Sequence, residues 1–195
     1  MTPFLRPLIT SACALVFSIT CAAAAGAPFD IAKEFRAEVQ AEMMGQSMAF
    51  TLSADGEDRQ RMDMPAMGMS TIIRKDQQKI FVLMTSQKQV MEMPYDPKMA
   101  QKGLNFSDDK NATWNDKGSD TVRDIACEKW EVTSGKGEHM TCWVKSDHTP
   151  VRITSKDGGT ADFLSFTPGK QDAALFDPPT GWATMAGMGQ MMPGK

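Results

Sequence analysis

The chain has 195 residues and a formal net charge of −3, and 23% of its residues are charged without forming a basic run. This length predicts one domain that is large enough to bury a core. The charge pattern argues against nucleic acid or an anionic membrane surface as a partner.

Residues 1–25 resemble a bacterial secretory signal peptide. A short segment with the single charge Arg6 precedes the apolar run PLITSACALVFSIT, and Ala23–Ala25 fits the small-residue pattern of a cleavage site. We therefore expect a periplasmic or secreted protein whose mature chain begins near Gly26. Two alternatives stay open: the apolar run is nearly long enough to anchor the chain in a bilayer, and Cys21 could carry a lipid, although the residues before it match a lipobox poorly.

The first half of the mature chain alternates apolar and polar residues, which is typical of strands with one buried face. Residues 34–43 alternate in this way, and Gly45-Gln46 predicts a hairpin turn that pairs Val39 with Leu52. The same reasoning predicts loops at 55–57, 76–77 and 87–88, with Phe50 opposite Met62, Ile73 opposite Ile80, and Met84 opposite Met91. The expected product is an antiparallel meander with one apolar face and one charged face.

A polar segment rich in proline and glycine follows Met93. Asp96 could cap a short helix that has Pro97 at its first position and ends before Gly103. Because the rest of the chain reads as strands, residues 95–106 are the predicted lid.

Strands resume at residue 121 and include two cysteines. A two-residue loop at Ser134-Gly135 would place Cys127 directly opposite Cys142. These are the only cysteines after the signal peptide, so a cross-strand disulfide is expected in an oxidising compartment. A CxxC motif is absent from the sequence, which argues against thiol–disulfide catalysis.

The fold expected from these segments is mainly β (α+β), with about ten short strands and one short helix. A meander of this length must curl, since otherwise it leaves two open edges. We expect an incomplete antiparallel barrel around the apolar face. The domain limits are 1–25 for the signal peptide, 26–182 for a single β domain, and 183–195 for a flexible tail rich in methionine and glycine.

Methionine is abundant, with 17 in the chain and four between residues 62 and 69. Thioethers pack irregular cavities and accept varied apolar partners, and they are also soft ligands that select Cu(I). The cavity interpretation fits better, because most of the methionines lie on the predicted apolar face. The predicted lining residues are Val39, Met48, Phe50, Met62, Met64, Val82, Met84 and Met91. The alternative Cu(I) site would use Met67, Met69, Met188 and Met191.

Catalytic motifs are scarce. The sequence has no GxSxG, HExxH or P-loop, and its two histidines, His139 and His148, are not spaced as a metal site. We therefore expect neither an enzyme nor a bound cofactor.

The segment RMDMPAMGMSTIIRKDQQKIFVLMTSQKQVMEMP is similar to the signature of a methionine-rich exported bacterial family, domain of unknown function 4412. The later segments CEKWEV, TCWVKSDHTPVRITS and LFDPPTGW resemble the second half of that family and the wider group of LolA- and LolB-like lipoprotein carriers. This resemblance implies an incomplete antiparallel barrel with a helical lid over an apolar cavity that holds acyl chains in transit. Unlike those carriers, this chain lacks a clear amphipathic helix before its first strand, and its cavity would be lined mainly by methionine.

The function expected from the sequence is non-enzymatic binding of a lipid or other hydrophobic small molecule in a concave, methionine-lined cavity. An envelope protein is the alternative partner. A Cu(I)-binding protein and a structural envelope protein without a ligand are the alternative functions.

Overall fold

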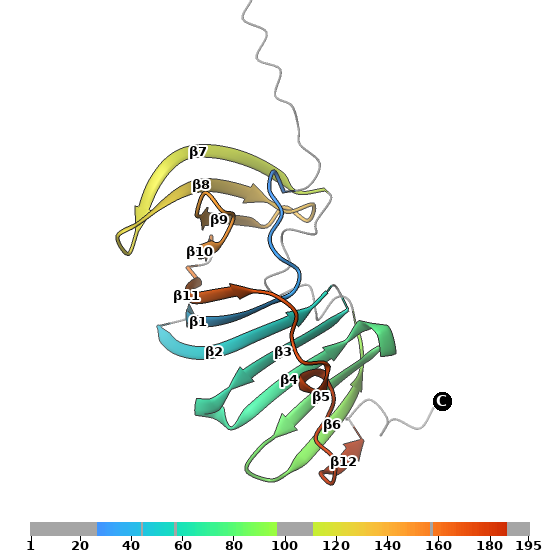
Figure 1. Ribbon diagram of the computed structural model, residues 1–195. Coiled ribbons are helices and arrows are strands. Elements are labelled where there is room, and N and C mark those ends of the chain that lie inside the picture. Colours follow the sequence, from blue (N-terminus) through green and yellow to red (C-terminus); the bar gives the residue numbers. More distant parts are fainter. Residues whose placement is uncertain (1–26, 44, 57, 97–110, 157, 187–195) are drawn as a thin grey trace, which may run out of the picture.

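The computed structural model describes residues 27–43, 45–56, 58–96, 111–156 and 158–186. These residues form one open sheet of 12 strands (Figure 1). The strands are β1 (Phe35–Met43), β2 (Gln46–Asp55), β3 (Arg59–Met64), β4 (Met69–Arg74), β5 (Lys79–Met84), β6 (Gln89–Pro94), β7 (Thr113–Val122), β8 (Ile125–Thr133), β9 (His139–Val144), β10 (Pro150–Ser155), β11 (Thr160–Pro168) and β12 (Ala183–Ala186). Three short 3-10 helices accompany them: η1 (Pro65–Met67), η2 (Lys75–Gln77) and η4 (Ala173–Phe176).

The strand order is β12-β6-β5-β4-β3-β2-β1-β11-β10-β9-β8-β7. The chain starts in the middle of the sheet with β1, extends along one side through β2–β6, and builds the other side from β7 at the far edge back to β11 beside β1. All of these pairs are antiparallel except that of β12 with β6, which is parallel. Figure 1 places the two edge strands, β7 and β12, at opposite ends of the molecule.

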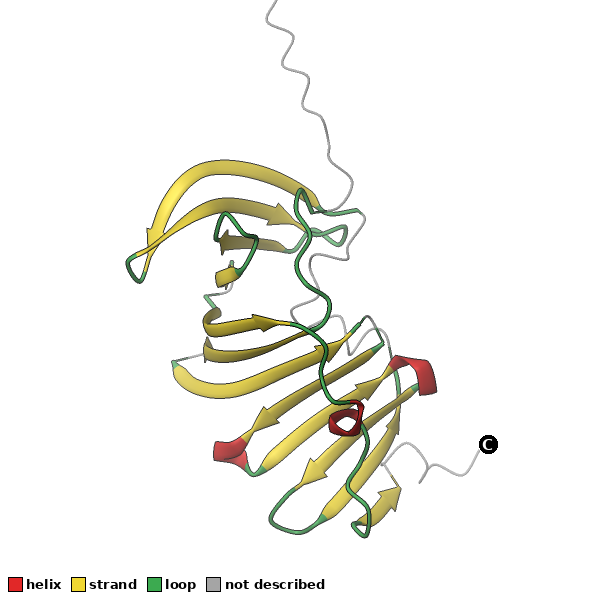
Figure 2. Ribbon diagram, viewed as in Figure 1, coloured by secondary structure: helices red, strands yellow, loops and turns green. Residues whose placement is uncertain are grey.

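These observations confirm the mainly β, antiparallel prediction and correct its helical part. Within the described ranges the helices are short 3-10 turns and none is an α-helix (Figure 2). The predicted helix at 97–103 and most of the predicted lid at 95–106 lie outside the described residues, so the lid has no support here. Residues 183–186, which the sequence assigns to the tail, form β12.

Among the hairpins of β1–β6, the predicted register is correct at one turn and shifted by two residues at the other three. Ile73 pairs with Ile80 as expected, whereas Val39 pairs with Phe50 instead of Leu52. The cause is a tighter first turn, in which Met43 pairs with Gln46 and Gly45 has a φ of +76°. Side chains alternate along a strand, so a shift of two leaves each residue on its predicted face.

One face of β1 and β7–β11 carries an aromatic core. The N-terminal segment closes it: the Phe29 ring meets the ring of Trp114 at 5.4 Å and that of Trp130 at 5.8 Å, both edge-on. The buried members are Phe29, Ala37, Val39, Ala112, Trp114, Val132, Cys142, Val144, Ile153 and Phe163.

A second core lies on the opposite face of β4–β6. The segment that links β11 to β12, residues 169–182, is named the strap here. It crosses this face (Figure 2). Its Phe176 side chain is fully buried among Ile72, Phe81, Leu83 and Val90. The prediction of one charged face is therefore only partly right for these strands, because that face also carries buried apolar residues.

The predicted disulfide between Cys127 and Cys142 is also wrong. Both cysteines are free and buried, because Cys142 pairs with Trp130, three positions away from the predicted partner. An odd shift moves a residue to the other face of its strand. Cys142 accordingly belongs to the aromatic core, whereas Cys127 packs with Val122 and Val151 in a separate cluster.

Candidate functional site

The most distinctive surface is one face of β2–β6, named the methionine face here. The cross-strand register aligns its side chains in rows. One row holds Met64, Met69, Met84 and Gln89; the next holds Leu52, Met62, Thr71, Val82 and Met91; the third holds Ala54, Gln60, Ile73, Ile80 and Met93. Met48 and Phe50 extend the face on β2. It is continuous with the aromatic core, because Leu52 pairs with Ala37 and Phe50 with Val39.

No charged residue lies on the methionine face of β2–β6. All the charged residues of these strands fall on the other face, which the strap crosses: Asp55, Arg59, Arg61, Asp63, Arg74, Lys79 and Glu92. Such a complete separation of charged from uncharged residues is unusual for a sheet with two solvent-exposed faces, because each exposed face normally carries charged residues.

The structure places all eight predicted lining residues on the same side of the sheet. Seven of them are half-buried, namely Met48, Phe50, Met62, Met64, Val82, Met84 and Met91. Val39 is buried in the aromatic core and contributes no open surface. Large apolar side chains that stay half-exposed over five adjacent strands are typical of an interaction surface.

The two hollows that stand out in the described residues lie away from the methionine face. Two hollows, of about 230 and 240 Å³, lie near β7–β10 and near β10–β11. Neither is lined by any of the eight predicted residues. Within the described residues, the methionine face is a half-exposed surface of the sheet.

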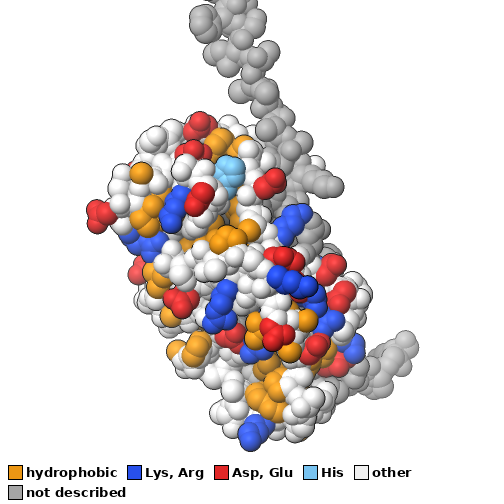
Figure 3. All heavy atoms as spheres, viewed as in Figure 1, with side chains coloured by type: hydrophobic (Ala, Val, Ile, Leu, Met, Phe, Trp, Pro, Cys, Tyr) orange, Lys and Arg blue, Asp and Glu red, His pale blue; other side chains and the backbone are white. Residues whose placement is uncertain are grey.

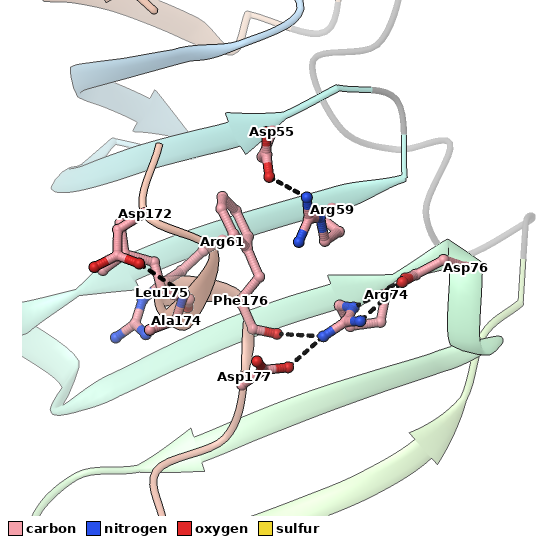
Figure 4. A network of polar contacts seen from close by, with 10 residues as sticks. All are labelled: Asp55, Arg59, Arg61, Arg74, Asp76, Asp172, Ala174, Leu175, Phe176 and Asp177. Carbon is pink, nitrogen blue, oxygen red and sulfur yellow. Dashed lines mark hydrogen bonds and ion pairs between the residues drawn. The ribbon is translucent and has the colours of Figure 1, made fainter. Parts of the chain in front are cut away.

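The opposite face is held by two arginines that bind the strap (Figure 4). Arg61 Nη1 donates to the carbonyl of Leu175 at 2.9 Å, and Arg74 Nη1 donates to the carbonyl of Phe176 at 3.2 Å. Arg74 also pairs with Asp177 of the strap and with Asp76. Arg59 lies 5.7 Å from the centre of the Phe176 ring. The strap is thus fixed by a buried ring and by hydrogen bonds to its own backbone.

Carboxylates next to these arginines are kept ionised. Burial raises the pKa of Asp63, but hydrogen bonds from Arg61 and from the Ser70 hydroxyl outweigh it and leave the pKa below its ordinary value. The pKa of Asp76 is lowered by its hydrogen bonds from Arg74. Figure 3 shows acidic and basic side chains mixed over the part of the sheet that the strap crosses.

The structure describes two of the four candidates for the alternative metal site, Met67 and Met69. Met67 is 53% exposed in η1, Met69 lies on the methionine face, and Met188 and Met191 lie outside the described residues. His139 Nδ1 lies 3.1 Å from the Thr133 hydroxyl. Within the described part of the chain, no three His, Cys, Asp or Glu side chains are grouped as a metal site.

Sequence reasoning missed Arg61, Arg74 and Phe176, which fix the strap. The signal was present in the runs STII and KIFVLM, where apolar residues occupy consecutive positions. Such runs are typical of strands buried on both faces. A second covering element was therefore to be expected over β4 and β5.

None of the helices in the described ranges has the length and apolarity needed to cross a bilayer.

Among solved structures, an uncharacterized conserved protein from Thermus thermophilus has a TM-score of 0.57 and 14% identity, over 80% of this chain and 91% of that one. MucB has a TM-score of 0.51 and 10% identity, over 77% of this chain and 59% of MucB. A LolA superfamily protein, NE2245 from Nitrosomonas europaea, is 12% identical over 78% of this chain and 92% of that one, but its TM-score of 0.37 is too low to carry an argument. At these identities the likeness concerns the fold alone.

No curated protein sequence matches the chain. The family described as "Domain of unknown function (DUF4412)" matches residues 35–149, which run from β1 to the turn before β10 and make up more than half of the chain. This match confirms the resemblance to the DUF4412 family. The chain belongs to the DUF4412 family.

Proposed function

We propose that this protein is exported, has no catalytic activity, and binds a hydrophobic ligand such as a lipid acyl chain on the methionine face. The observation that carries the proposal is the segregation of charge: the face is apolar across β2–β6, while every charged residue of these strands lies on the other side. A sheet face that contacts only water would not need to exclude charged residues.

Methionine suits a flexible ligand for a physical reason. Its unbranched side chain has three rotatable bonds and a polarizable sulfur, so a surface of methionines can repack around ligands of different shape. Burial of each ligand methylene contributes about 0.8 kcal/mol. A chain of many methylenes laid across the rows can therefore bind without a single polar contact.

The aromatic core supports this arrangement by fixing one border of the face. Val39 is buried and Phe50 packs against that core, so the sheet is rigid where the methionine face begins. MucB, whose fold is similar, has been solved in complex with MucA(peri). A protein segment is therefore the alternative occupant that an experiment must separate from a lipid.

The first test is native mass spectrometry of the mature chain, purified from a bacterial periplasm without detergent. We expect an adduct of lipid mass. An adduct of protein mass would favour a partner chain, and a bare mass would leave the ligand proposal to the binding test that follows.

A binding test uses a fluorescent fatty acid and two matched variants. Met62→Lys places a charge in the middle row of the face and should weaken binding by at least about tenfold, because the lysine must be desolvated. Met67→Lys makes the same change in the exposed η1 turn and should bind like the parent chain. Equal affinity of both variants would contradict the proposal.

Export is tested separately by the intact mass of the full chain expressed in a bacterium. We expect a periplasmic product that begins near Gly26. A full-length product in the membrane fraction would indicate an anchor, and a mass increase on a product starting at Cys21 would indicate a lipoprotein.

A further inference from the structure

Three methionines stand side by side at one end of the methionine face. Met64 of β3 pairs with Met69 of β4, and Met69 pairs with Met84 of β5. Neighbouring strands lie about 4.8 Å apart, and directly opposed side chains on one face are in contact range. Met69 therefore has a thioether neighbour on each side.

No other row of this face has this arrangement. In the next row Met62 and Met91 are separated by Thr71 and Val82, and the third row holds only Met93. Random scatter of methionines over an apolar face would not require three of them to be consecutive. The cluster therefore calls for an explanation beyond general apolarity.

We propose that Met64, Met69 and Met84 form a binding site for a soft monovalent cation, Cu(I). Thioether sulfur prefers Cu(I) to hard cations. Three neutral ligands leave a monovalent ion with one positive charge, which an apolar surface tolerates better than two. Side chains on the outer strands need to lean only part of one strand spacing toward Met69 to share an ion with it.

The absence of carboxylates in this row makes the site selective. The nearest acidic residue in the register, Asp63, lies on the opposite face, where it binds Arg61 and Ser70. Zn²⁺ favours imidazole and thiolate, and Ca²⁺ and Mg²⁺ favour several oxygen ligands. Beyond the three thioethers the row offers only the neutral amide of Gln89, which pairs with Met84. The site should therefore discriminate against these ions.

The backbone holds the row in place. The amide of Gly68 donates to the carbonyl of Pro65 at 3.0 Å, and the amide of Thr85 donates to the carbonyl of Gly68 at 2.9 Å. These bonds tie the turn after Met64 to the end of β5 beside Met84. The row lies at the rim of the sheet next to this exposed turn, so an ion can reach it without opening the fold.

The test is a titration of the mature chain with Ag(I) as a redox-stable probe, followed by Cu(I) in competition with a colorimetric Cu(I) chelator. We expect one ion per chain. The triple variant Met64→Leu, Met69→Leu, Met84→Leu should lose more than about tenfold in affinity. Leucine keeps the apolar area, so the fold should persist. The titration contains no fatty acid, so its outcome does not depend on the proposed ligand function.

Two control variants decide where the ion binds. Met62→Leu, Met91→Leu and Met93→Leu together remove three thioethers from the other rows and should leave the affinity unchanged. Replacement of Met185, Met188, Met191 and Met192 by leucine should also leave it unchanged. Loss of the ion in either control with retention in the row variant would overturn the proposal, as would a parent chain that binds no Ag(I).

Discussion

The two halves of the sheet, β7–β11 and β3–β6, are covered on opposite faces and by different segments. Around β7–β11 the core is aromatic, and the N-terminal segment covers it with Phe29. Around β3–β6 the strap covers the opposite face with Phe176. The face that Phe29 covers on β7–β11 continues onto β3–β6 as the methionine face. There it stays half-exposed, and methionine takes the place of the aromatic residues.

This difference shows how one continuous apolar face can have two roles. Aromatic rings have few rotamers and pack in fixed edge-on pairs, which suits a permanent core. Methionine side chains rearrange at little cost, which suits a surface that is covered only at times. The strap makes this possible, because it stabilises β4–β6 from behind and leaves their methionine face open.

The largest effect is expected from removal of the aromatic ring that covers each half of the sheet, Phe176 or Phe29. Phe176→Ala should destabilise the protein by about 3–5 kcal/mol, because it leaves a large cavity under the strap. Chemical denaturation measures this, and hydrogen exchange shows whether β4–β6 lose protection before β7–β11. Phe29→Ala should give the reverse order of protection. A uniform loss in both variants would mean that the halves form one cooperative unit.

Removal of Arg74 tests the polar part of the strap contact. Arg74→Met should cost about 1–3 kcal/mol, since the Phe176 carbonyl loses its donor in a buried position. Urea denaturation provides the measurement. The matched control is Lys79→Met, whose ion pair with Glu92 is exposed and contributes little. Equal effects of the two substitutions would show that Arg74 acts only as a surface charge.

Acid should weaken the contacts on the strap side of the sheet. The pKa of Asp63 and that of Asp76 are lowered in the folded chain, so the unfolded chain takes up protons first as the pH falls below the ordinary value of 3.8. Stability should therefore decrease between that pH and the lower folded values. Asp63→Asn should flatten this part of the pH profile, measured by denaturation at each pH, whereas Asp58→Asn at an exposed position should not.

Reducing agent should have the smallest effect, namely none on the melting temperature, because the two cysteines lie on opposite faces. Burial raises the pKa of the Cys142 thiol to about 12 and also raises the pKa of the Cys127 thiol. A thiol reagent should accordingly label neither in the native state and both in denaturant. Absence of label in denaturant would indicate a disulfide and a different register of β8 and β9.

Sequence reasoning located β1–β6 and β8–β11, and it assigned the faces of β1–β6 correctly, because alternation has a period of two. It missed most of β7, which begins before residue 121, and it missed β12, which lies in the predicted tail. The hairpins at Val39 and at Met84 were displaced by two residues, which left the predicted methionine face intact. The hairpin that holds Cys142 was displaced by three residues, because the turn after Thr133 is longer than the two-residue loop that was expected. The two cysteines therefore do not face each other as predicted.

The covering elements were harder to predict. The strap contains no long apolar run, and its contact depends on Arg61 and Arg74, which look like ordinary surface charges in an alternating strand. The two arginines acquire this role only when the strap, about a hundred residues later in the chain, folds over them. Alternation along one strand carries no information about a segment that distant.

The short strand β12 matters for how the protein behaves at high concentration. By pairing with β6, residues 183–186 occupy hydrogen-bonding groups that would otherwise accept a strand from a second molecule. β6 has Val90 on one face and Met91 on the other. Two molecules paired along an uncovered β6 would therefore have apolar contacts on both faces of the joined sheet. The four residues that follow the strap thus protect the β6 edge from pairing with a second molecule.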